Sequence, residues 1–109
     1  MPVDYELLRD IGRSKPDDLV IVHAEGDSME PLIADGARVM VDTRDTRLRE
    51  GIFAFRVGDE LRVKRLRRLG SDAIELLSEN PRYEPEILAE DRLRDFAILG
   101  RVLWVATTI

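Results

Sequence analysis

The feature of this sequence that most restricts its fold is a succession of short apolar runs, each bounded by glycine, proline or aspartate. The runs have the length of ordinary strands and are too short for most helices. Two of the breaks are hairpin signals, at Gly58-Asp59 and at residues 69–72. Short strands at this spacing predict a mostly β fold, either a curled antiparallel sheet or a small, partly closed barrel. The expected strands cover residues 19–24, 38–41, 52–57, 60–66, 73–77 and 96–106.

The N-terminal residues have a different pattern. Apolar residues at positions 5, 7, 8 and 11, followed by Gly12, predict a short helix over residues 4–11. We therefore expect residues 1–18 to form this helix and a lead-in. A chain of 109 residues suits one domain, which we place at residues 19–109. Within it, the compact run at residues 19–24 is interpreted as a buried strand. Residues 87 and 88 are expected to form a short stretch of pairing with a neighbouring strand.

The last apolar run, residues 96–106, is long and carries few charges. An unpaired apolar strand tends to associate with other chains, so this one is expected either at the centre of the sheet or against a second chain. Gly100 lies within the run and predicts a bulge or bend.

Composition excludes several classes of function. The chain has no cysteine and one histidine, so thiolate chemistry and Cys- or His-rich metal sites are excluded and no cofactor is expected. The single His23 ends an apolar run and is expected to be satisfied by packing. A net charge of −5 argues against general attraction to nucleic acid or an anionic membrane. No membrane span or secretory signal is recognisable, so the expected location is the cytoplasm.

A serine lies at the tight junction between the first two expected strands. The segment Gly26–Pro31 contains Ser28, and the turn residues Asp35-Gly36 follow. A nucleophile can be held at such a junction. The alternative is structural, with Asp27 or Ser28 capping one helical turn over residues 28–33, in which Pro31 suits the first position.

A basic run in the fourth expected strand has three interpretations. It can be a charged strand facing water, a nucleic-acid patch, or a catalytic element. Lys64 differs from the arginines because Val63 and Leu66 flank it and can desolvate its ammonium group. The run contains Arg62, Lys64, Arg65, Arg67 and Arg68.

Ser28 and Lys64 together make a minimal catalytic pair. A lysine is a general base only when neutral, so its pKa must fall from about 10.4, usually by burial. Neutral Lys64 would then take the proton of Ser28 Oγ, and the alkoxide would attack a peptide carbonyl. Backbone amides of the Asp27-Ser28 turn are candidates to hold the oxyanion.

From about Leu19 to its end, the sequence resembles the C-terminal peptidase-like domain of LexA, UmuD and phage repressors. Four motifs carry the resemblance in order, and together they are specific. They are Gly26–Pro31 with Asp35-Gly36, Glu60–Leu66, Ser78–Pro81 with Tyr83, and Gly100–Val102.

The resemblance implies roles for three residues. Ser28 is the nucleophile, Lys64 the general base, and the amides of Asp27 and Ser28 the oxyanion donors. It also implies a mostly β, partly closed fold and a homodimer formed through the C-terminal strand. A RecA-type co-protease is an implied partner. The full-length regulators repress DNA-damage (SOS) or prophage genes and are inactivated by self-cleavage.

The chain departs from the family pattern in two ways. DNA is bound in the family through an N-terminal helix-turn-helix, for which the residues before Leu19 are too few. The Ala-Gly or Cys-Gly cleavage dipeptide is also missing, because Gly12, Gly26 and Gly36 follow other residues. We therefore expect no self-cleavage at the usual dipeptide.

Three functions remain open from the sequence. The first is the regulatory, dimerising and self-cleavage-type serine/lysine peptidase domain of a LexA- or phage-repressor-like transcriptional regulator. The second is a stand-alone serine peptidase acting in trans, and the third is a non-catalytic dimerisation module.

Overall fold

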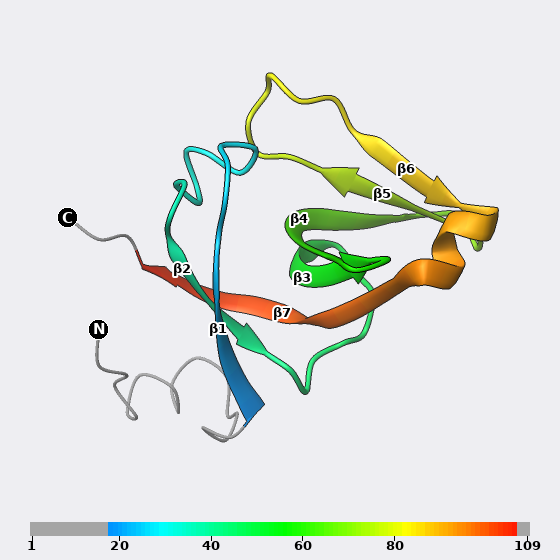
Figure 1. Ribbon diagram of the computed structural model, residues 1–109. Helices are drawn as coiled ribbons and strands as arrows, with labels where there is room; N and C mark the ends of the chain where they lie inside the picture. The colour runs from blue at the N-terminus through cyan, green and yellow to red at the C-terminus, as the bar shows by residue number, and fades with distance from the viewer. Residues whose placement is uncertain (1–17, 107–109) are drawn as a thin grey trace.

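The chain forms one antiparallel sheet of seven strands in a computed structural model that describes residues 18–106. The sheet curls without closing, and β1 and β6 are its edges (Figure 1). This confirms the predicted mostly β fold. The strands are β1 (Leu19–His23), β2 (Arg38–Asp42), β3 (Gly51–Val57), β4 (Glu60–Leu69), β5 (Ala73–Leu77), β6 (Glu86–Ala89) and β7 (Phe96–Ala106), in the spatial order β1-β2-β7-β3-β4-β5-β6.

Both predicted hairpins are present. Val57 pairs with Glu60 across Gly58, whose positive φ of 60° is a conformation that glycine adopts without steric cost. Leu69 pairs with Ala73 across the second turn. The brief pairing expected at residues 87 and 88 is the β6 ladder with β5, and a 3₁₀ helix that was not predicted, η2 (Glu90–Asp95), follows it. The helix expected at residues 4–11 lies outside the described residues, and the division after residue 18 stays a prediction.

The first strand is not buried, contrary to expectation. Val20 and Ile21 expose 36% and 44% of their surface, respectively. The reason is position, since among the strands of residues 18–106 β1 pairs with β2 alone and lies at the edge of the sheet. A continuous apolar run does not reveal whether other elements will cover both of its faces.

β7 is central, which is one of the two positions expected for it. It runs between β2 and β3 through the middle of the molecule (Figure 1). Its two neighbours cover different halves, because β3 pairs with residues 96–101 and β2 with residues 101–106. The predicted irregularity near Gly100 is confirmed by a register shift in the ladder with β3.

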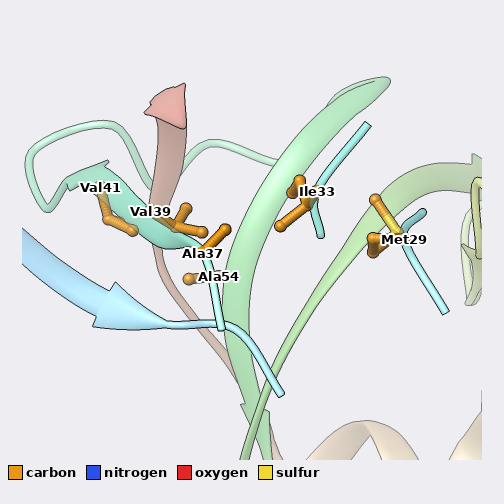
Figure 2. Close-up of a cluster of buried hydrophobic side chains, with 6 residues drawn as sticks. All are labelled: Met29, Ile33, Ala37, Val39, Val41 and Ala54. Atoms are coloured by element: carbon orange, nitrogen blue, oxygen red, sulfur yellow. The ribbon is translucent and has the colours of Figure 1, made fainter. Parts of the chain in front are cut away.

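The core is divided between two clusters on opposite faces of the sheet. Neighbouring residues of β3 belong to different clusters, because successive side chains of a strand alternate in direction. The first cluster also contains three residues of the segment between β1 and β2, which it anchors to the sheet (Figure 2). Its members are Met29, Ile33, Ala37, Val39, Val41 and Ala54, and those of the second are Phe53, Phe55, Leu66, Ile74, Leu76 and Leu88.

Replacing Gly100 with alanine is expected to destabilise the fold by about 1–3 kcal/mol, as overpacking does. A Cβ atom at Gly100 would clash with the backbone carbonyl of Asp42, whose carbon would be only 2.7 Å away. Urea denaturation of Gly100→Ala measures the change. Gly51→Ala is the matched control, because a Cβ there meets only the Phe53 ring at 3.4 Å. Equal stabilities of the two variants would contradict the prediction.

Candidate active site

Ser28 lies on a compact segment between β1 and β2 that is closed at its base. The amide of Gly26 donates to Asp35 Oδ1 at 2.8 Å, and the amide of Gly36 donates to the carbonyl of Ala24 at 2.8 Å. The predicted helical turn over residues 28–33 is instead a run of hydrogen-bonded turns, in which Ile33 N donates to Met29 O. Ser28 is therefore carried on a loop fixed at its ends and by its apolar side chains.

Ser28 and Lys64 line the same groove, which has a volume of about 560 Å³. One wall is formed by the end of β1 and the residues after it, and the other by Glu60–Lys64 of β4. The fold thus brings together the two residues that were predicted to act as a pair. Apolar residues of the first cluster, Met29 and Ile33, also contribute to the lining.

Lys64 is buried, with 9% of its surface exposed. Burial holds the pKa of its amine below the ordinary lysine value of 10.5, and the nearby positive charge of Arg62 adds to this effect. Glu86 and Glu60 act in the opposite direction. A lysine with a lowered pKa is more readily deprotonated and so better suited to act as a base.

The polar contact of the Lys64 amine is with a residue that had no predicted role. Nζ donates to Ser78 Oγ at 2.8 Å, and within residues 18–106 no hydrogen bond joins Nζ to Ser28. Nζ also lies 5.7 Å from the centre of the Tyr83 ring. Only one of the two apolar neighbours expected to shield the Lys64 amine lies on the same side as the amine. Leu66 shares a face of β4 with Lys64, whereas Val63 packs with the first cluster on the opposite face.

The loop after β5 joins both halves of the site. It carries Ser78, and its Asn80 donates from the backbone amide to Ser28 O and from Nδ2 to Asp27 O, each at 3.0 Å. The Tyr83 hydroxyl donates to the carboxylate of Asp27. The loop and the Ser28 segment lie side by side at the top of the view (Figure 1). The sequence motif of Ser78–Pro81 with Tyr83 marks this loop but predicts none of its contacts.

Three of the four arginines of the basic run are paired with carboxylates. Arg62 lies 2.9 Å from Glu86, Arg65 lies 2.7 Å from Glu79, and Arg67 contacts Glu75. These pairs favour the interpretation of β4 as a charged strand facing water over a nucleic-acid patch, with Lys64 as the buried exception.

Other groups at the groove do not form a further site. His23 is exposed in the groove wall and is not satisfied by packing, contrary to expectation. Within residues 18–106 no group of three or more histidines and carboxylates is placed to hold a metal ion. In the same range no helix has the length and apolar character needed to cross a bilayer.

The chain is similar to a known protein family and to several known regulators. The model of the Peptidase S24-like family matches residues 1–103. The repressor protein CI of Enterobacteria phage phi80 is 43% identical over 82 residues, which are 74% of this chain and 34% of that protein. The HTH-type transcriptional regulator PrtR of Pseudomonas aeruginosa is 38% identical over 107 residues, covering 94% and 41% of the two chains.

A LexA repressor of Herminiimonas arsenicoxydans is 35% identical over 105 residues, which are 95% of this chain and 46% of the relative. The chain thus spans less than half the length of each of these relatives. With a family match over nearly its whole length and repressors among its relatives, the chain belongs to the Peptidase S24-like family.

Proposed function

We propose that Ser28 and Lys64 form a serine/lysine dyad that hydrolyses a peptide bond, within the regulatory domain of a LexA- or phage-repressor-like transcriptional regulator. The observation that carries the proposal is the burial of Lys64 in the wall of the groove that Ser28 also lines. The repressor names of the relatives support the regulatory role.

The chemistry needs only groups of this chain. Neutral Lys64 Nζ accepts the proton of Ser28 Oγ, and the alkoxide attacks the carbonyl carbon of the substrate. The amides of Asp27 and Ser28 stabilise the oxyanion, and the Lys64 ammonium returns the proton to the departing amine. Water then hydrolyses the acyl ester with Lys64 again acting as the base.

The groove suits a peptide in an extended conformation. The ladder between β4 and β5 covers Arg65–Leu69, so residues 60–64 have no partner in β5. These residues form the β4 wall of the groove. An extended peptide can add to such an open strand edge through its backbone. The substrate is a segment of the regulator's own polypeptide, and a RecA-type co-protease is the partner expected to promote cleavage.

A non-catalytic dimerisation module is the second candidate. One observation favours it, because within residues 18–106 no hydrogen bond joins Lys64 Nζ to Ser28. A peptidase acting in trans uses the same dyad and differs only in its substrate.

Dimerisation is proposed through the C-terminal half of β7. Residues 102–106 pair with β2 on one flank and have no partner in β3 on the other. Leu103 and Trp104 are half-buried there and belong to neither core cluster. A second copy of β7 would pair with this flank, which no other strand of residues 18–106 occupies, and would cover these side chains.

Cleavage of an Ala-Gly peptide added in trans is expected to rise about tenfold per pH unit from neutrality, because activity follows the neutral fraction of Lys64. The rise should level off below pH 10.5, the ordinary lysine value. Mass spectrometry of timed samples measures the rate. Ser28→Ala removes the nucleophile, and Lys64→Arg retains a cation that cannot act as a base; both should be inactive. Folded protein that cleaves at no pH would support the module instead.

Lys64→Met is expected to increase stability at neutral pH by about 1 kcal/mol, a common gain for a single stabilising substitution. The folded state holds the proton of Lys64 less tightly than the unfolded state does. At pH values below the pKa of Lys64 in the folded protein, the buried ammonium therefore lowers the free energy of unfolding. This cost disappears as pH rises through 10.5. Urea denaturation across this range should show the advantage of Lys64→Met shrinking, and an advantage independent of pH would contradict the argument.

Trp104 reports directly on the proposed dimer because it is the only tryptophan of the chain. Its fluorescence is expected to move to longer wavelength on dilution, as the open flank of β7 becomes exposed to water. Sedimentation equilibrium should show dissociation over the same concentrations. Leu103→Glu should show the spectrum of the diluted parent protein at every concentration, because a charge buried in the interface would prevent association. A monomer whose spectrum is constant would refute this interface.

A further inference from the structure

The Lys64 amine has a defined hydrogen-bond partner that the dyad chemistry does not include. Ser78 Oγ lies 2.8 Å from Nζ and accepts its hydrogen bond. Ser78 is half-buried at the first position after β5. Asn80, two residues later, holds the backbone of Asp27 and Ser28. The position of this hydroxyl relative to the Ser28 segment is therefore set by the fold.

A neutral amine must be oriented as well as deprotonated. It has two N–H groups and one lone pair, and rotation about the Cε–Nζ bond exchanges their directions. Only an orientation with the lone pair toward Ser28 Oγ permits proton transfer. When one N–H is held by an acceptor, fewer orientations remain for the lone pair, and pre-orientation of this kind accelerates a reaction.

We propose that Ser78 is a positioning residue for the reaction, whose hydroxyl oxygen holds one N–H of Lys64 and thereby directs the amine lone pair toward Ser28. This inference rests on the proposed function and adds a third residue to the dyad. The same oxygen also stabilises the ammonium that forms when Nζ takes the Ser28 proton, since hydrogen bonds to charged groups are stronger than those to neutral ones.

The chain offers an unusually simple test, because it contains two lysines, Lys15 and Lys64. With Lys15→Arg as background and ¹³C-labelled lysine, a single Cε resonance reports the protonation of Lys64. Removing the acceptor in Ser78→Ala weakens the charged form, so the titration midpoint should move to lower pH. Cleavage of the Ala-Gly peptide at its high-pH plateau should fall about 10- to 100-fold.

Two matched variants complete the experiment. Ser78→Thr retains the hydroxyl and should restore both the midpoint and most of the rate. Ser71→Ala removes an exposed hydroxyl from the turn between β4 and β5 and should change neither. Circular dichroism of each variant establishes that the fold is intact.

The outcomes separate this proposal from the alternatives. A midpoint that does not move in Ser78→Ala, or an unchanged plateau rate, overturns the positioning role. A midpoint that rises toward 10.5 overturns it too, because it means that water has entered a loosened loop. If the parent protein cleaves nothing, the proposed peptidase fails, and the resonance alone decides whether Ser78 holds Lys64.

Discussion

The arrangement of the site depends on how β7 pairs with both of its neighbours. Its C-terminal half belongs to a ladder with β2, and its N-terminal half belongs to a ladder with β3. The Ser28 segment follows β1 and precedes β2, whereas Lys64 is on β4, which is attached to β3. The strand that joins these two parts of the sheet therefore sets the distance across the groove. Gly100 is located at this crossing, where the backbone of Asp42 leaves no room for a side chain.

The burial of Lys64 places stability and chemistry in opposition. An ammonium group loses hydration when it is buried, and in this protein its polar contacts are a neutral hydroxyl and an aromatic ring. These contacts stabilise the ammonium but replace its lost hydration only in part, so burial still favours the neutral amine, which is the form that can act as a base. Arginine lacks this property because its pKa is too high to be shifted to neutrality, and Arg62 and Arg65 of the same strand contact carboxylates instead. Burial of Lys64 thus lowers the stability of the fold at the position of β4 where the proposed reaction needs a base.

The loop after β5 links the two sides of the groove through hydrogen bonds. Asn80 and Tyr83 contact the segment that carries the serine, and Ser78 contacts the lysine. A displacement of this loop would therefore alter both members of the pair together. Pre-organisation of this kind is effective because groups held in place need little reorganisation during a reaction. The proposed peptide edge on β4 is adjacent, so substrate binding and orientation of the base share one wall.

The sequence by itself determined the alternation of strands and turns, the two hairpins, and the identity of Ser28 and Lys64 as candidates. These features are local, since they depend on periodicity, glycine conformations and motifs of a few residues. Only the tertiary structure decided that β1 is exposed, that β7 is shared between two ladders, and that Lys64 donates to Ser78. Residues 64 and 78 follow directly on the last pair of the β4–β5 hairpin, Arg65 with Leu77, so the predicted turn already brings them near each other. The hydrogen bond itself also depends on the path of the chain after β5 and on the direction of both side chains, which chain spacing does not encode. Burial of an edge strand likewise depends on what packs against it, which no single segment of sequence contains.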